Sequence, residues 1–218
     1  MNEHFRLRIC FAKTGRLRWL SHLELVRAME RLIRRSGLPY AVSQGFSPHM
    51  RYAPGPALPV GTAGLNELFD VWLTAYVPVA EAKVMLGLAS AGLIAISGVD
   101  YVANSEKGLQ ATHTVSSYLV TVGSASLGLA DMQSALDSLV AREQLELPYK
   151  KETRQYDLTA CIVEPPVVLA AGDSGGFEIS CVLRDLGQGV LRPDMLVSAA
   201  LGDRGEVLQV TRISVEKP

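Results

Sequence analysis

Residues 21–37 constrain the fold more than any other segment, because they hold a complete set of helix start and stop signals. Ser21 suits the N-cap, and Glu24 completes a capping box. Gly37 suits the left-handed residue that closes a helix. The pattern predicts a helix over residues 22–35. It follows an alternating apolar and basic segment, residues 5–13, that predicts a half-buried strand.

The hydrophobic pattern predicts a similar order of elements in each half of the chain. The first half has the order β-α-β-β-α-β of the ferredoxin-like fold. Its elements are expected at residues 5–13, 22–35, 40–43, 68–77, 79–88 and 93–102. Those of the second half are expected at residues 114–122, 129–140, 145–150, 156–163, 177–183, 193–201 and 207–215. We therefore expect an α+β protein made of two tandem ferredoxin-like sandwiches with antiparallel sheets.

A polar stretch with one glycine, residues 103–110, is the expected boundary between the halves. It predicts a basic N-terminal domain at residues 1–102 and an acidic C-terminal domain at residues 111–218. Residues 45–64 hold four prolines and four glycines, which predicts a long extended loop. Such a loop is typical of a binding loop or an ordered cover.

Charge is divided unevenly along the chain, although the net charge of the whole is only −1. Residues 1–60 hold ten basic residues against three acidic ones, a net charge of +7, and the remainder holds 11 against 19, a net charge of −8. Nine of the ten are arginine, whose planar fork suits phosphates and stacks on bases. Two interpretations stay open: a surface that faces a polyanion, or two parts that neutralise each other at an internal interface.

Four arginines repeat at helical spacing within the predicted helix. They are Arg27, Arg31, Arg34 and Arg35, at positions i, i+4, i+7 and i+8. Glu30 can pair with Arg34, but one glutamate cannot neutralise four arginines. A solvated helix face more often mixes the two signs, so this stripe favours contact with a polyanion.

The motifs of the common catalytic and cofactor-binding classes are missing from the sequence. It has no Walker A loop, no GxGxxG after a strand, no CxxxCxxC, no HExxH and no GxSxG. Its three cysteines, at positions 10, 161 and 181, form no CxxC pair, and its four histidines, at positions 4, 22, 49 and 113, are scattered. We therefore expect no metal and no cofactor.

No segment of the sequence predicts a membrane span. The longest uncharged run, residues 84–99, has 16 residues and three glycines, whereas a membrane helix needs about 20 apolar residues. The first residues are charged and lack the apolar core of a signal peptide. We expect a soluble, cytoplasmic protein without a membrane partner.

His22, next to Ser21 at the helix start, is the one weak catalytic candidate. It could act as a general base or donate to a phosphate, but the simpler interpretation is that Ser21 caps the helix and His22 lies near the surface. Four further side chains could stack on bases or anchor the proline-rich loop to the sheet. They are Tyr40, Phe46, His49 and Tyr52.

Two blocks of the first domain match a known family pattern. They are residues 13–24 (KTGRLRWLSHLE) with Arg27 and Arg31, and residues 45–48 (GFSP) followed by Arg51, Glu67 and Asp70. They resemble the bacterial radical-SAM-linked domain family, an uncharacterised family whose members occur alone or fused behind a cobalamin-binding radical SAM enzyme. Weaker matches run through Lys150, Lys151, Arg154 and Asp157 to Arg192, Pro193 and the last strand. The sequence departs from the pattern at His49 and Met50, where the family has Arg and Pro.

The resemblance implies a partner rather than an activity. Because the chain has no cluster-binding cysteines, the resemblance implies an accessory part that works with a radical SAM protein in trans and presents a substrate to it. RNA, as tRNA or rRNA, is the preferred substrate, on the evidence of the arginines and the α+β sandwich. As an analogy of fold alone, tandem ferredoxin-like domains also occur in CRISPR RNA-processing endonucleases.

Three hypotheses follow. The first is a non-catalytic RNA-binding accessory protein, with a radical SAM enzyme that modifies RNA or ribosomes as its partner. The second is a protein-interaction module that docks its basic face on such a partner. The third is a metal-independent endoribonuclease that uses His22 with Lys13 or Arg18. The expected nucleic-acid-binding residues are Lys13, Arg16, Arg18, His22, Arg27, Arg31, Arg34, Phe46, Arg51 and Tyr52.

Overall fold

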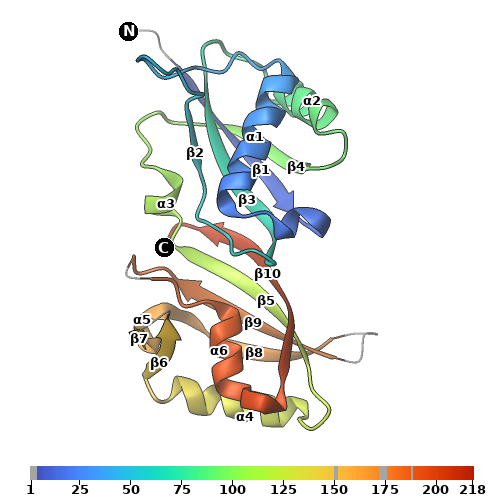
Figure 1. The fold of residues 1–218 in the computed structure, drawn as a ribbon, viewed down its shortest axis with the longest axis vertical. Helices are drawn as coiled ribbons and strands as arrows, with labels where there is room; N and C mark the ends of the chain where they lie inside the picture. Colours follow the sequence, from blue (N-terminus) through green and yellow to red (C-terminus); the bar gives the residue numbers. More distant parts are fainter. Residues whose placement is uncertain (1–3, 150–151, 172–175, 188) are drawn as a thin grey trace. The chain divides into compact units, whose positions relative to one another are not determined.

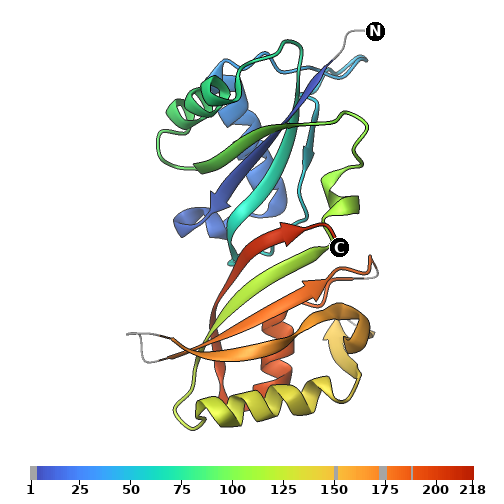
Figure 2. The ribbon, with the colours of Figure 1, turned by 180° about the vertical axis from the view of Figure 1, so that it is seen from behind.

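The computed structural model describes residues 4–149, 152–171, 176–187 and 189–218, and the chain divides into two compact units. The first is Met1–His113 and the second Thr114–Pro218. Each unit combines antiparallel strands with helices, so the chain is a mixed α+β protein, as the sequence predicts. Figures 1 and 2 show the ribbon from opposite sides.

The first unit carries its two long helices on one face of an antiparallel sheet. Its elements are β1 (Phe5–Lys13), η1 (Gly15–Trp19), α1 (His22–Ser36), β2 (Tyr52–Pro54), β3 (Ala63–Leu73), α2 (Val79–Ser90), β4 (Ala95–Val102) and α3 (Leu109–Thr112). The strands pair in the order β4-β1-β3-β2. α1 and α2 lie side by side over this sheet (Figure 1), and Leu7, Ile9 and Phe11 of β1 join their core.

α1 forms where its local signals predict it. The Ser21 hydroxyl accepts a hydrogen bond from the Glu24 backbone N–H at 3.4 Å, and the Glu24 carboxylate accepts one from the Ser21 backbone N–H at 2.8 Å. Gly37 closes the helix with φ +77°, a conformation that glycine adopts without a Cβ penalty. The capping box and the C-cap are therefore confirmed.

The second strand of the first unit was predicted in the wrong place. Residues 40–43 form only isolated bridges, and the strand at the sheet edge is β2, inside the predicted loop. The Tyr52 ring stacks on Phe69 of β3, with ring centroids 5.2 Å apart, and this anchors the segment. Pro54 is tolerated because an edge strand leaves some backbone groups unpaired.

The second unit repeats the arrangement with an added hairpin. Its elements are β5 (Val115–Gly123), α4 (Leu129–Val140), β6 (Gln144–Tyr149), β7 (Glu152–Asp157), α5 (Leu158–Cys161), β8 (Ile162–Ala171), β9 (Gly176–Arg184), α6 (Pro193–Leu201), η2 (Gly202–Arg204) and β10 (Glu206–Glu216). The main strands pair antiparallel in the order β10-β5-β9-β8, while β6 and β7 pair with each other. α4 and α6 share one core with these strands.

The prediction of one strand at residues 156–163 of the second unit is wrong. The chain breaks there into the end of β7, the short helix α5 and the start of β8. The Asp157 carboxylate causes the break, because it accepts hydrogen bonds from the backbone N–H groups of Thr159 and Ala160 at 3.0 and 3.2 Å. The family matches at Lys150 and Lys151 lie outside the described residues.

Across the described ranges, every helix is too short or too polar to span a membrane.

Candidate nucleic-acid interface

The two faces of the first sheet receive different side chains from β1. Leu7, Ile9 and Phe11 point to the helices, so the alternating residues Arg6 and Arg8 point to the opposite face. Trp72 of β3 is the register partner of Arg6 and therefore lies on that opposite face too. The arginines of the first sixty residues are thus distributed over two sides of one sheet.

The arginines of β1 are neutralised inside the unit. Asp70 is fully buried and binds both of them, with 2.7 Å between Arg6 Nη2 and Asp70 Oδ2 and 2.8 Å between Arg8 Nε and Asp70 Oδ1. The hydrogen bond to Asp70 raises the pKa of Arg8 above its usual value. Arg8 also pairs with Glu106 at 3.5 Å. For these two arginines the internal-neutralisation interpretation holds.

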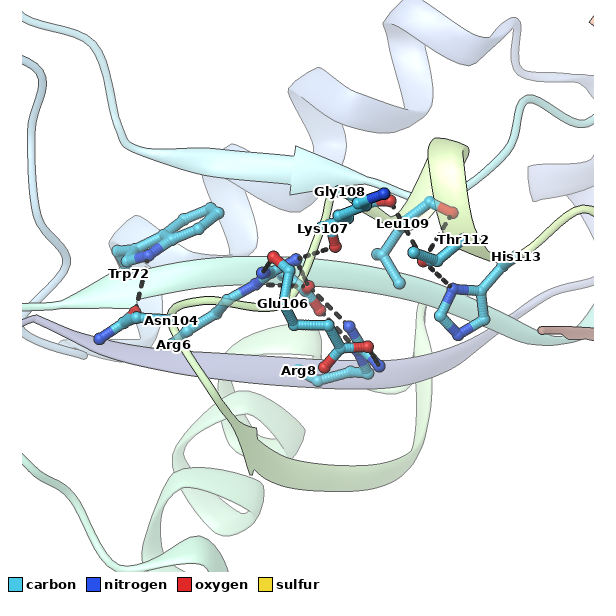
Figure 3. A network of polar contacts seen from close by, with 11 residues as sticks. Arg6, Arg8, Trp72, Asn104, Glu106, Lys107, Gly108, Leu109, Thr112 and His113 are labelled. Atoms are coloured by element: carbon cyan, nitrogen blue, oxygen red, sulfur yellow. Dashed lines mark hydrogen bonds and ion pairs between the residues drawn. The ribbon is translucent and has the colours of Figure 1, made fainter.

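Arg6 also binds the segment that was predicted to hold the boundary between the two domains. Its guanidinium donates to the backbone carbonyls of Glu106 and of Lys107, the latter at 3.3 Å, and Figure 3 shows both groups facing it. Residues 103–113 therefore belong to the first unit and pack on its sheet. Their contacts cover the sheet face where Arg6 and Arg8 lie.

Arg51 belongs to the same face. Its guanidinium carbon lies 4.8 Å from the centre of the Trp72 ring, and that of Arg6 lies 4.9 Å from it. Trp72 Nε1 donates to Asn104 at 3.1 Å, and Arg51 contacts the His4 ring nitrogen at 3.3 Å. Arg51 therefore lies on the side of the sheet away from α1. It is therefore separated from the arginine stripe of α1.

The arginines of η1 and α1 are directed outward. Arg16, Arg27, Arg31, Arg34 and Arg35 are exposed, and none of these five forms an ion pair within the part of the chain that the structure describes. The expected Glu30–Arg34 pair is not formed between these described residues. Together with the half-buried Arg18, they make up what we call the basic surface. The exposed guanidinium groups of the other five suit phosphate contacts.

Trp19 adds an exposed ring to the basic surface, and sequence reasoning missed it. The ring is 59% exposed, and the Arg18 guanidinium lies over it at 4.8 Å from the centroid. Gly61 supports the ring from the proline-rich loop, where a Cβ would come within 3.3 Å of it. The sequence did offer a signal, because Trp19 follows Arg16 and Arg18 directly and precedes the helix start in the KTGRLRWLSHLE block.

The prediction that Lys13 contacts a phosphate is wrong. Its side chain is fully buried, and its ammonium donates to the Pro59 carbonyl at 3.4 Å. A buried ammonium cannot reach an RNA backbone, which also removes the pairing of His22 with Lys13 for cleavage. Tyr52 is half-buried against Phe69, so its ring anchors β2 rather than offering a face for a base.

Phe46 lies fully exposed near the tip of a hairpin-like loop. The loop is closed by hydrogen bonds between Ser43 and His49, from the Ser43 N–H to the His49 carbonyl at 2.8 Å and from the His49 N–H to the Ser43 hydroxyl at 3.1 Å. Met50 is buried and fixes its base. The ring is therefore held away from the core, as stacking on a partner requires.

His22 shares a pocket with Glu67, which the sequence placed only in the family pattern and not in a site. The pocket is small, with a cavity volume of about 20 Å³, room for about one water molecule. It is lined by Phe11, His22, Leu25, Val26, Pro54, Gly55, Pro56, Leu58, Glu67, Leu68 and Phe69. Glu67 is only 4% exposed. No local pattern marks this pairing, because His22 and Glu67 come from α1 and β3.

No group of three or more His, Cys, Asp or Glu side chains suited to a metal ion occurs among the residues that the structure describes.

Comparisons with known proteins give a family and a fold. A family model described as "Uncharacterized protein conserved in bacteria (DUF2344)" matches residues 6–193. No curated protein matches the chain. Two of the solved structures similar to the chain cover 96% of it. One is the "Crystal Structure of a Cbf5-Nop10-Gar1 Complex", at 9% identity and TM-score 0.52. The other is the "Crystal structure of the archaeal box H/ACA sRNP Nop10-Cbf5 complex", at 10% identity and TM-score 0.50.

These likenesses concern the fold alone. The chain spans about half of the matched chain in each complex, 48% in both cases.

Proposed function

We propose, for a chain that belongs to this family of uncharacterised proteins conserved in bacteria, that it is a non-catalytic RNA-binding accessory protein. The basic surface would hold phosphates, and Trp19 and Phe46 would stack on unpaired bases. One observation carries the proposal: the arginines of α1 are exposed and form no ion pair within the described residues.

The similarity of fold to solved structures also supports a role in RNA binding. Both similar structures are of complexes that contain Cbf5 and Nop10, and one of them is an archaeal box H/ACA sRNP, a ribonucleoprotein. The resemblance to the radical-SAM-linked family supports a radical SAM enzyme in trans as the partner, acting on tRNA or rRNA. Within this proposal the chain presents RNA, and the partner carries the chemistry.

Each unit is proposed to be a ferredoxin-like sandwich. The strand orders β4-β1-β3-β2 and β10-β5-β9-β8 support this, because each unit then follows the order β-α-β-β-α-β around an antiparallel sheet. In the second unit the β6–β7 hairpin and α5 are inserted after the first helix. The first unit holds 12 basic and 8 acidic residues and the second 9 and 14, so net charges of +4 and −5 support a basic and an acidic domain.

The experiment measures RNA affinity of the full chain over a range of salt concentrations. Wild-type affinity should fall steeply with salt, because phosphate contacts release counterions. Arg27→Glu/Arg31→Glu should weaken binding by about tenfold or more at low salt. Arg142→Glu/Arg204→Glu, two exposed arginines of the second unit, is the matched control and should bind as the wild type does. Equal binding by the Arg27/Arg31 variant would refute the proposal.

A protein-interaction module is the second candidate, and an exposed apolar stripe on α2, rather than the basic face expected from the sequence, favours it. Val84 and Leu88 are 60% and 78% exposed at i, i+4 spacing on a helix that lies beside α1 (Figure 1), and Leu93 just beyond α2 is 70% exposed. An exposed apolar stripe often marks a protein contact. Co-purification of a partner that survives nuclease treatment, and that is lost in Leu88→Glu but kept in Arg31→Glu, would favour this candidate over RNA binding.

A further inference from the structure

Three aromatic rings that the proposed function does not use gather beside the loop from β3 to α2. We propose that the outermost ring, Tyr76, is a stacking platform for one unpaired base of RNA. The inference rests on the proposed function, since the base would belong to a strand whose phosphates lie on the basic surface. It deepens that function by assigning a substrate class, RNA with a single-stranded segment, because bases inside a duplex already stack on one another.

The Tyr76 ring is both exposed and fixed in position. It lies between β3 and α2 and is 58% exposed. One face of the ring stacks on Tyr101 of β4, with ring centroids 5.0 Å apart and 27° between the ring planes. Because that contact occupies one face only, an exposed fraction this large leaves the other face to the solvent. An aromatic face held in this way suits stacking with a base of any type, since every base has a π-face.

Tyr101, the ring beneath Tyr76, is itself anchored to the backbone. Its hydroxyl donates to the Val77 carbonyl at 2.8 Å and accepts a hydrogen bond from the Val77 N–H at 3.1 Å. Phe5 of β1 packs edge-on against both tyrosines, with ring centroids 5.8 Å from Tyr76 and 6.3 Å from Tyr101. A ring that its neighbours already immobilise loses little conformational entropy when a ligand stacks on it. The platform is therefore preorganised.

The platform lies at the end of the unit where α1 presents its last arginines. The Thr74 N–H and hydroxyl both donate to the Pro39 carbonyl, at 2.7 and 3.1 Å. Pro39 is three residues beyond the last residue of α1, and Thr74 is two residues before Tyr76. The loop from β3 to α2 and the C-terminal end of α1 therefore lie at one end of the unit, as both ribbon views show (Figures 1 and 2). Arg34 and Arg35 are exposed in the last turn of α1, so they can hold phosphates beside the platform.

Trp19 and Tyr76 thus lie at opposite ends of one row of arginines. Trp19 precedes α1, which has 15 residues and is therefore about 22 Å long. Arg27 and Arg31 are exposed along the helix between the two ends. Bases that follow one another at about 3.4 Å need about six or seven nucleotides to run the length of α1. Aromatic rings combined with a positively charged surface are the usual arrangement in proteins that bind single strands.

The affinities of the full chain for a single-stranded RNA of about ten nucleotides and for the same sequence as a duplex test the platform. Tyr76→Ala should weaken binding of the single strand by about tenfold and leave duplex binding unchanged. Tyr76→Phe should bind both as the wild type does, because stacking needs the ring and not the hydroxyl. Leu208→Ala, in the second unit and also 58% exposed, is the matched control and should bind both as the wild type does. Unchanged binding of the single strand by Tyr76→Ala, or an equal loss for the duplex, would overturn the inference.

Photocrosslinking of the wild-type chain decides the question if Tyr76→Ala fails to fold. Under long-wavelength ultraviolet light, 5-iodouracil forms covalent bonds with aromatic side chains on which it stacks. A single-stranded RNA that carries 5-iodouracil should crosslink to Tyr76, and mass spectrometry of the digested complex identifies the modified residue. Tyr76→Phe should still crosslink at the same position. Crosslinks at other residues without one at Tyr76 would overturn the inference.

The arginine variant separates this inference from the proposed function. Arg27→Glu/Arg31→Glu should lose affinity for the single strand and for the duplex alike, because it removes phosphate contacts that both RNAs offer. That loss, together with unchanged binding of the single strand by Tyr76→Ala, refutes the platform alone. Wild-type binding by Arg27→Glu/Arg31→Glu refutes the proposed function, whatever Tyr76→Ala does. Tyr76→Ala should also keep the salt dependence of the wild type, since a stacking contact releases no counterions.

Discussion

The two groups of arginines in the first unit show how one residue type can serve two purposes in one fold. On β1, Arg6 and Arg8 share the buried Asp70, and Arg6 is only 2% exposed. On α1, Arg27, Arg31, Arg34 and Arg35 are exposed without an ion pair in the described ranges. The first group holds the fold together, and the second is available to a partner.

The comparison teaches that charge counted along a segment is not charge on a surface. Residues 1–60 carry a net charge of +7, yet Arg6 and Lys13 are buried and Arg51 lies on the face away from α1. What remains is a narrower basic surface on η1 and α1. Its function depends on the strands beneath it, because their ion pairs fix the sheet on which α1 packs.

Removing the shared carboxylate should have the largest effect. Asp70→Asn leaves Arg6 and Arg8 without their buried countercharge, and the free energy of unfolding should fall by about 3–5 kcal/mol. Both tryptophans, Trp19 and Trp72, are in the first unit, so tryptophan fluorescence during urea unfolding reports on that unit. Asp100→Asn, at an exposed position on β4, should stay within about 0.5 kcal/mol of the wild type. A similar loss of unfolding free energy in Asp70→Asn and Asp100→Asn would contradict a special structural role for the arginines that Asp70 binds.

Removing the ring between Arg6 and Arg51 should have the next largest effect. Trp72→Leu loses two cation–π contacts and the hydrogen bond to Asn104, so we expect a loss of about 1–2 kcal/mol in unfolding free energy. Chemical unfolding followed by circular dichroism measures it. Trp19→Leu removes one such contact at an exposed ring and should cost only about 0.5 kcal/mol. A larger loss of unfolding free energy in Trp19→Leu than in Trp72→Leu would show that the sheet face of Arg6, Arg51 and Trp72 contributes less to stability than the exposed ring does.

Removing the cap of α1 tests how firmly the exposed arginines are supported. Ser21→Ala should cost about 1 kcal/mol, the usual value of an N-cap. Hydrogen bonds from the Ser21 hydroxyl and backbone lower the pKa of Glu24 below its ordinary value of 4.5. A lowered carboxyl pKa stabilises the fold above the ordinary value and ceases to do so as the pH falls through the folded value. Unfolding at pH 7 and pH 3 should therefore differ less in Ser21→Ala than in the wild type.

Removing one exposed arginine should have the smallest effect on stability. Arg31→Ala should change the free energy of unfolding by no more than about 0.5 kcal/mol. If Arg31 contacts a phosphate of single-stranded RNA, the slope of log affinity against log salt should become shallower by about 0.7. A change in stability without a change in slope would place Arg31 with the structural arginines of β1.

Local sequence signals were sufficient to predict an element wherever that element contains its own start and stop residues. The helix at residues 22–35 was predicted from Ser21, Glu24 and Gly37, and α4 and α6 have the bounds that their patterns predict. The strand at residues 40–43 failed because strand formation depends on a partner. Tyr52 lies against Phe69, and this contact between residues far apart in the sequence places β2 inside a segment that was predicted to be a loop.

The candidate site was predictable only in part, for the same reason. Helical spacing gave the exposed arginines of α1, since one turn of a helix fixes which side chains share a face. No spacing indicates that Asp70 reaches Arg6 and Arg8, or that Glu67 and His22 line one pocket, because each arrangement joins different elements.

The sequence by itself determined the order of most elements, the caps of α1 and the row of arginines on it. Tertiary structure alone decided which basic side chains stay in water. Burial of a charge requires a countercharge that a different strand supplies, and only the pairing of β1 with β3 brings Asp70 to Arg6 and Arg8.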